Sequence, residues 1–209
     1  MKKNYHTLII GTGCAGFNAA DKLYDLGVKD IAIITEGRYM GTSRNTGSDK
    51  QTYYKLSLCG SDGDSVREMA DTLYLGGGVM GEHALCEAAY SARCFMRLVE
   101  LGVPFPTNEF GEYAGYKTDH DPRMRATSCG PLTSKYMTEA LERSVLSKGI
   151  EIIDFQRVIS FYSKSTRQQD NETTSQQVNK STGQQVNRST RQSPAEDTCS
   201  LKTYNSNNN

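Results

Sequence analysis

The chain has 209 residues, 36% of them hydrophobic, and its 24 basic residues balance its 24 acidic ones. A net charge of zero gives no basic surface of the kind that binds nucleic acid or an anionic membrane. No stretch approaches the roughly 20 apolar residues that span a bilayer, and the chain start lacks a secretory-signal pattern. A cytoplasmic protein with no membrane insertion is therefore expected.

The first 36 residues predict a βαβ unit. Thr7–Ile10 form an apolar run that ends at a glycine, which is typical of a buried parallel strand. A helix is expected from Cys14 to Leu26, closed by Gly27. Its apolar stripe would consist of Ala15, Ala19, Leu23 and Leu26. Ile31–Ile34 repeat the buried-strand pattern, and the crossover between the strands should be right-handed.

A GxGxxG motif joins the first strand to this helix, at Gly11-Thr12-Gly13-Cys14-Ala15-Gly16. In a dinucleotide-binding unit, the first glycine permits the tight turn, the second lets the backbone approach a pyrophosphate, and the third allows close helix–strand packing. The helix N-terminus offers unpaired N–H groups to the phosphates. Glu36, which ends the second strand, can accept hydrogen bonds from the adenosine ribose hydroxyls and disfavours a 2′-phosphate.

The residues after Glu36 favour FAD over NAD, although both cofactors use this unit. A polar loop follows at once and includes Gly37, Thr42, Ser43, Thr46, Gly47 and Ser48. FAD is long, and a second stretch of backbone donors could follow its pyrophosphate, ribityl chain and ring. An NAD-binding module remains the alternative interpretation.

Three further helices are expected along the chain. Ser65 and Glu68 have the spacing of a capping box for a helix that ends at Leu75. The clearest helix runs over residues 82–101. Its apolar stripe would consist of Leu85, Ala89, Ala92, Phe95, Met96 and Val99, and Cys86 and Cys94 should share its buried face. Loops fill residues 103–125, a helix follows over residues 134–148, and strands are expected at 150–155 and 158–161.

The composition changes at Tyr162. Residues 162–209 are rich in Gln, Asn, Ser and Thr and include the near-repeats QQVNKSTG and QQVNRSTR. Such a segment buries too little apolar surface to offset the entropy of ordering it, so it is predicted to be a disordered tail. The expected organisation is an FAD-binding domain over residues 1–161, α/β in class, with a Rossmann-like parallel sheet, flanking helices and an incomplete fold, followed by this tail.

The motifs together resemble the N-terminal part of the flavoproteins of the fumarate reductase, succinate dehydrogenase and L-aspartate oxidase family. The resemblance rests on GTGCAG, Glu36, the loop around Ser43–Ser48, the stretch LVELGVPF ending at Phe105, and Arg125-Ala126-Thr127. It implies an FAD-dependent oxidoreductase that transfers hydride between flavin and a small substrate such as a dicarboxylate. It also implies that the backbone near Val158 borders the adenine and that Thr42–Ser48 border the flavin.

Two departures from that family qualify the function. Members with covalently attached flavin carry a histidine in the loop after the acidic residue, and residues 43–48 contain none, so FAD should be bound noncovalently. The family's capping domain and catalytic arginine have no counterpart here, so no catalytic residue is assigned. A non-catalytic, truncated flavin-binding fragment that needs a second chain to complete its domain and cap is therefore the second alternative.

Two weaker groups of residues could bind a ligand. Asp119-His120-Asp121 invites a metal interpretation, but neighbouring side chains on an extended chain point in opposite directions, so a solvated loop is favoured and no metal is predicted. Arg123 and Arg125 could hold a substrate carboxylate, although loop arginines are more often solvated or paired internally.

Overall fold

The computed structural model describes residues 3–48, 51–60, 63–119, 121–164 and 198–205. The chain divides into two compact units. The first comprises Met1–Arg157 with Asn205–Asn209, and the second comprises Val158–Tyr204. The first unit contains the whole βαβ region and every predicted helix, so the candidate site is built within it.

A three-stranded parallel sheet forms the centre of the first unit. Its strands are β1 (Thr7–Ile10), β2 (Ile31–Ile34) and β5 (Glu151–Ile153), in the order β1-β2-β5. Thr7 of β1 lies opposite Ile31 of β2, and Ile34 of β2 lies opposite Ile153 of β5. All four residues of β2 are buried, as expected for the central strand. The predicted α/β class with a parallel sheet is confirmed.

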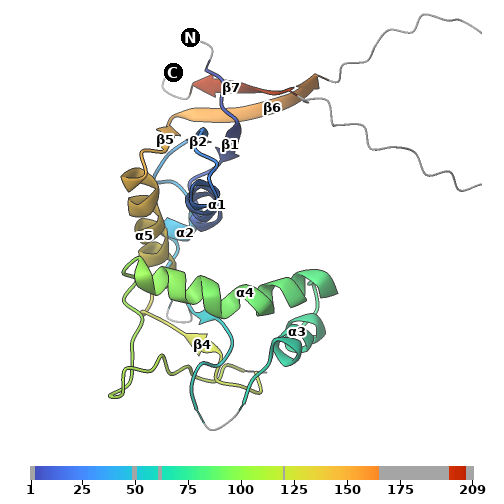
Figure 1. Cartoon of the computed structure of the whole chain (residues 1–209), viewed down its shortest axis with the longest axis vertical. Helices are drawn as coiled ribbons and strands as arrows, with labels where there is room; N and C mark the ends of the chain where they lie inside the picture. The colour runs from blue at the N-terminus through green and yellow to red at the C-terminus, as the bar shows by residue number, and fades with distance from the viewer. Residues whose placement is uncertain (1–2, 49–50, 61–62, 120, 165–197, 206–209) are drawn as a thin grey trace, which may run out of the picture. The chain divides into compact units, whose positions relative to one another are not determined.

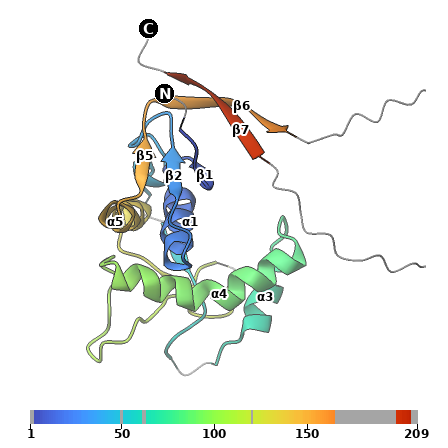
Figure 2. The same ribbon diagram turned by 45° about the horizontal axis from the view of Figure 1, so that its top comes forward.

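Two helices, α1 (Cys14–Asp25) and α5 (Thr133–Ser147), pack beside each other beneath this sheet (Figures 1 and 2). Alternate strand residues, among them Ile31 and Ile33, point into their shared core, because successive strand side chains alternate between faces. The helices contribute Phe17, Ala20, Ala140, Leu141 and Val145 to that core. The sheet and the two helices therefore share one hydrophobic core.

A second layer of the first unit is built from α3 (Val66–Leu75), α4 (Gly81–Glu100) and a short antiparallel pair. That pair joins β3 (Tyr53–Tyr54) to β4 (Ala126–Thr127). Phe95 on α4 is fully buried among aromatic rings, with its ring centroid 4.7 Å from that of Phe105. Figure 1 shows α4 running crosswise below α1 and α5. The predicted helices are confirmed with ends shifted by one residue or so, within the usual uncertainty of helix boundaries.

The predicted buried stripes of α1 and α4 were largely wrong, although Phe95 is buried as predicted and Leu23 and Val99 are partly buried against the core. On α1 the buried residues are Phe17, Ala20 and Asp21, whereas Leu26 is 80% exposed. On α4 the buried residues are Ala84, Ala88, Ser91, Phe95 and Leu98. Leu85 is 49% exposed, and Cys86 and Cys94 are also exposed. The small residues Ala84 and Ala88 form the part of α4 that packs on α3, whereas Leu85 and Met96 are exposed.

Asp21 is buried because three partners satisfy its charge. Its carboxylate accepts hydrogen bonds from Lys148 Nζ at 2.7 Å, from Arg97 at 3.0 Å, and from the hydroxyl of Ser144. Burial alone would raise the pKa of Asp21, but these three partners outweigh it and lower the pKa below the ordinary value of 3.8. The cluster therefore joins α1, α4 and α5 through a single buried carboxylate.

We expect this carboxylate to give the protein an acid-sensitive stability. Because the pKa of Asp21 is lower in the folded than in the unfolded chain, its contribution is present above about pH 4 and is lost as the pH falls through the folded value. Asp21→Asn should cost about 3 kcal/mol of unfolding free energy at pH 7 and flatten the acid dependence. Thermal melts from pH 7 to pH 3 measure both effects; equal acid sensitivity in the two proteins would contradict this account.

The described part of the second unit is formed by two paired strands. They are β6 (Gln156–Lys164), whose first two residues belong to the first unit, and β7 (Thr198–Asn205), whose last residue also belongs to the first unit. Figure 1 shows the two arrows running in opposite directions. β6 continues three residues past the expected domain boundary, and β7 lies inside the segment expected to be a tail. Residues 165–197 and 206–209 of that segment lie outside the described residues, so its disorder stays a prediction.

The described part of the chain contains no helix with the length and apolar character that a bilayer crossing requires.

Candidate dinucleotide-binding site

The glycine motif forms a tight turn between β1 and α1. Gly11 donates a backbone hydrogen bond to the carbonyl of Ile34 at 2.8 Å and has a φ of +98°, a left-handed conformation that favours glycine. A Cβ added at Gly16 would lie 2.1 Å from the carbonyl oxygen of Gly11. The first and third glycines are therefore required by the backbone of the turn itself.

The N-terminus of α1 is open to a phosphate group. Gly13 is the N-cap in an extended conformation and, as a glycine, provides no side-chain cap. The N–H of Cys14 donates to Ser43 Oγ at a long 3.3 Å. Uncapped N–H groups together with the positive end of the helix dipole form an anion-binding arrangement. This helix end is suited to hold a pyrophosphate.

The polar loop after β2 folds back onto this turn. It contains one short helix, α2 (Thr42–Asn45), where the sequence predicted only a loop. A Cβ at Gly41 would lie 3.4 Å from the carbonyl oxygen of Thr12, and one at Gly13 would lie 3.3 Å from Ser43 Oγ. The loop and the glycine turn are thus in direct contact, which the sequence had suggested only through the order of the motifs.

The far end of the loop is held by the turn that precedes α5. The N–H of Ser48 donates to the carbonyl of Pro131 at 3.1 Å. Gln51 accepts a hydrogen bond from the N–H of Ser134 at 3.0 Å and donates to the hydroxyl of Ser134 at 2.9 Å. Gln51 therefore satisfies one of the first N–H groups of α5 while it fixes the loop.

Glu36 lies where the second strand ends, as predicted, but it is paired with Arg157. Arg157 contacts Glu36 Oε1, and this hydrogen bond lowers the pKa of the Glu36 carboxyl. The Glu36 side chain is 41% exposed, so its carboxylate remains accessible to a ribose hydroxyl. The pairing with Arg157 was not predicted, because 121 residues separate the two partners in the sequence.

The other predicted cofactor-binding residues differ in exposure and in the unit to which they belong. Thr12 and Gly37 are buried, and the hydroxyl of Thr12 lies 3.1 Å from that of Thr35. Any contact of Thr12 with a ligand would therefore be through its backbone. The accessible residues around the turn and loop are Ala15, Thr42, Thr46, Gly47 and Ser48. Val158 belongs to the second unit, and its contact with adenine stays a prediction.

Arg123 and Arg125 are both used by internal ion pairs. Arg125 is fully buried and donates two hydrogen bonds to Asp64, at 2.7 and 2.9 Å. Arg123 pairs with Glu68 at 2.8 Å. Asp121 lies 3.3 Å from Arg125, and His120 is outside the described residues. The geometry thus gives these two arginines structural partners rather than a shared opening for a carboxylate.

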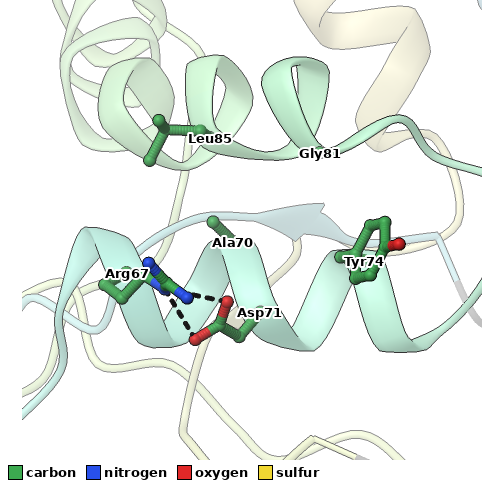
Figure 3. Close-up of a pocket in the computed structure, with 6 residues that line it drawn as sticks. All are labelled: Arg67, Ala70, Asp71, Tyr74, Gly81 and Leu85. Atoms are coloured by element: carbon green, nitrogen blue, oxygen red, sulfur yellow. Dashed lines mark hydrogen bonds and ion pairs between the residues drawn. The ribbon is translucent and has the colours of Figure 1, made fainter.

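A shallow pocket of about 240 Å³ lies between α3 and α4 (Figure 3). Its lining includes Leu85 and the exposed ion pair between Arg67 and Asp71, in which Arg67 Nε lies 2.9 Å from Asp71 Oδ2. It contains no residue of the glycine motif or of the polar loop. The candidate dinucleotide-binding site is therefore the N-terminus of α1 and not this pocket.

A family model for the FAD binding domain matches residues 6–193 of the chain. The chain belongs to this FAD binding domain family. FAD is accordingly the cofactor of this family, and the glycine turn fits it, since Gly16 leaves no room for a Cβ and the turn leads to a helix whose N-cap, Gly13, has no side chain. No curated protein sequence matches the chain at a significant level.

Solved structures with the same fold include Mycobacterium smegmatis Sdh1 in complex with UQ1, at 15% identity and a TM-score of 0.65. They also include the Escherichia coli quinol fumarate reductase FrdA, at 17% identity and a TM-score of 0.61. A third is the Rhodococcus jostii 3-ketosteroid-delta4-(5alpha)-dehydrogenase, at 17% identity and a TM-score of 0.59. The alignments cover 74%, 75% and 76% of this chain and 28%, 27% and 39% of those chains. This FAD binding domain protein therefore spans about a quarter to two fifths of their length.

Proposed function

We propose that the chain is the FAD-binding part of an oxidoreductase of the fumarate reductase and succinate dehydrogenase type, acting on a small substrate such as a dicarboxylate. The observation that carries this proposal is the contact between the glycine turn and the polar loop, through Gly13, Ser43 and Gly41. It is supported by the fold shared with a fumarate reductase. The steroid dehydrogenase of the same fold makes the substrate class the part most in need of a test.

Bound FAD would supply hydride transfer at its N5 atom, while the protein supplies binding and orientation. In this proposal the N-terminus of α1 holds the pyrophosphate and Glu36 accepts from the ribose hydroxyls. Thr42–Ser48 lie beside the flavin, where their backbone N–H groups and hydroxyls can orient it. None of these residues is assigned to proton transfer, because the family's catalytic arginine has no counterpart in the sequence.

FAD should be held noncovalently. Histidine is absent from residues 43–48, and the next one, His83, lies on α4 in the second layer of the first unit. Heat or acid denaturation of the flavin-loaded protein should therefore release free FAD into the supernatant, with no flavin left on the precipitated chain. Flavin fluorescence that stays with the polypeptide after denaturing gel electrophoresis would contradict this part of the proposal.

A further polypeptide segment, from a second chain, would complete the domain and its cap. Among the described strands, β1 pairs only with β2, so its other edge presents backbone N–H and C=O groups. Ile10 at the end of β1 is 58% exposed. An apolar strand edge beside the glycine turn is a surface that another parallel strand could cover.

A cytoplasmic location belongs to the same proposal. The five described cysteines, Cys14, Cys59, Cys86, Cys94 and Cys129, are all free thiols. Free thiols are the usual state in a reducing compartment.

The enzyme and the non-catalytic fragment are separated by one experiment. The flavin-loaded chain is mixed anaerobically with succinate, with fumarate after chemical reduction, and with a ketosteroid, while the flavin band is followed. A change in the flavin's redox state with a substrate, in this chain alone, supports the enzyme. Bound flavin that responds only to a chemical reductant supports the fragment that needs a second chain.

A further inference from the structure

Two arginines attach the polar loop to α5 through one buried carboxylate. Arg38 Nε lies 2.5 Å from Glu142 Oε1, and Arg44 contacts the other oxygen, Oε2. Arg44 also lies 3.2 Å from Glu139, one turn earlier on α5. The side chains of Glu142 and Arg44 are only 9% and 11% exposed. Charge-assisted bonds shielded from water in this way are stronger and more directional than surface pairs.

The start of the loop is fixed a second time at the end of β5. The N–H of Arg38 donates to Asp154 Oδ1 at 2.8 Å. The ring of Tyr39 then lies 5.4 Å from the guanidinium carbon of Arg38 and 5.2 Å from that of Arg44. The two guanidinium groups are thus held in place from several sides, and Glu142 is the acceptor that they share.

The helix that carries Arg44 is not anchored by burial of its own residues. α2 has four residues, and none of the four is buried. A helix of that length is not stable by itself in water. The position of this helix is nevertheless demanding, because its residue Ser43 must reach the N–H of Cys14 and its N-cap, Gly41, must lie against the glycine turn. The ion pairs of the Arg44 side chain therefore determine where Ser43 lies relative to the N-terminus of α1.

From this geometry we infer that Glu142 is a positioning residue for FAD: through Arg44 and Arg38 it holds the loop 41–48 against the phosphate-binding turn. This inference rests on FAD binding at that turn. It goes beyond the proposed function because Glu142 itself lies on α5, outside the motif and the loop. Without Glu142 the loop would be more mobile, and ordering it when FAD binds would cost conformational entropy. Loss of Glu142 should therefore weaken FAD binding.

Glu142→Gln tests the inference, because glutamine keeps the size of the side chain and removes its charge. We expect the Kd for FAD, measured by quenching of flavin fluorescence on titration of the full-length apoprotein, to rise at least tenfold. Arg44→Lys, which keeps the charge but not the fork that reaches two carboxylates, should raise the Kd by a smaller factor. In a background with both Arg38→Gln and Arg44→Gln, Glu142→Gln should add little, because Glu142 acts through its contacts with these two arginines.

Asp21→Asn is the matched control. Asp21 is also a buried carboxylate shared by two cations, but it lies seven residues after the start of α1, about 10 Å along the helix. The Asp21→Asn substitution should lower the melting temperature and leave the Kd for FAD within twofold of the wild-type value. Limited proteolysis gives a second readout, since cleavage within residues 41–51 should become faster in Glu142→Gln only.

The outcomes separate the inference from the proposed function. A wild-type Kd in Glu142→Gln overturns the inference alone, as does an equal loss of FAD affinity in Glu142→Gln and Asp21→Asn, which would indicate general destabilisation. If Glu142→Gln fails to fold, Arg44→Lys decides in its place, and an unchanged Kd there overturns the inference. A wild-type chain that takes up no FAD overturns the proposed function and the inference together.

Discussion

A Gly16→Val variant is expected to lose FAD binding completely and to fold poorly or not at all. A Cβ at this position would lie 2.1 Å from the carbonyl oxygen of Gly11 and 3.6 Å from a side-chain carbon of Ile9. The first of these neighbours is backbone within the glycine turn, so α1 would have to move away from β1. We expect a cost of at least about 3 kcal/mol, in the range of overpacking at a site that cannot relax.

Gly13→Ala should behave differently from Gly16→Val. Its added Cβ would meet only the hydroxyl of Ser43, at 3.3 Å, so the fold should survive. FAD affinity should still fall by a large factor, because the methyl group occupies space that the pyrophosphate needs. Gly81→Ala serves as the control, since nothing lies within 4 Å of its added Cβ.

Circular dichroism melts and FAD titration of the three variants measure fold and site separately. The expected order of melting temperatures is Gly81→Ala and Gly13→Ala close to wild type, with Gly16→Val far below. Only Gly81→Ala should bind FAD as the wild type does. A well-folded Gly16→Val protein with normal FAD affinity would show that the helix does not approach the turn as closely as described.

Loss of the buried Arg125 should destabilise the protein more than any other single ion-pair change. Arg125 and Asp64 are 0% and 1% exposed, and Arg125 also donates to Tyr54 at 3.1 Å. Burial raises the pKa of Asp64, but the hydrogen bonds from Arg125 and from the backbone N–H groups of Ser57 and Ser65 together outweigh that effect and lower it below the ordinary value. Arg125→Met would leave the Asp64 carboxylate buried without its cation, at a cost of about 3–5 kcal/mol.

Arg125→Lys should not restore stability, because a lysine cannot reproduce the two-pronged contact with Asp64. Arg67→Met is the control, since Arg67 makes the same kind of contact with Asp71 on the surface and its side chain is 83% exposed. Urea denaturation should show a large loss for both Arg125 variants and little change for Arg67→Met. Equal, small losses for Arg125→Met and Arg67→Met would contradict the buried network.

The sequence was most informative where chemistry and backbone geometry depend on neighbouring residues. The βαβ unit, the turn at Gly11–Gly16 and the capping contact between Ser65 and Glu68 all follow from local patterns, and the structure contains each of them. In each case the partners are close along the chain, so that glycine spacing or a hydroxyl three residues before an N–H is sufficient to identify them.

Contacts between distant segments could not be inferred in the same way. Arg44 and Glu142 are 98 residues apart, and a charge in a glycine-rich loop ordinarily predicts only a solvated side chain. The one available signal was the spacing of Glu139 and Glu142, which places two carboxylates on one face of α5. Asp21 was missed for a related reason: a charged residue was excluded from the core before its three partners on α4 and α5 were known.

The central claim, that this chain holds FAD noncovalently at the turn that begins α1, is tested most directly by its visible absorption spectrum. The purified full-length chain is titrated with FAD, freed of excess cofactor and scanned, and the flavin released by heat is identified by chromatography. The account predicts flavin bands that stay with the protein, free FAD on release, and neither in Gly13→Ala. A colourless protein that takes up no FAD, or uptake that Gly13→Ala does not reduce, would contradict it.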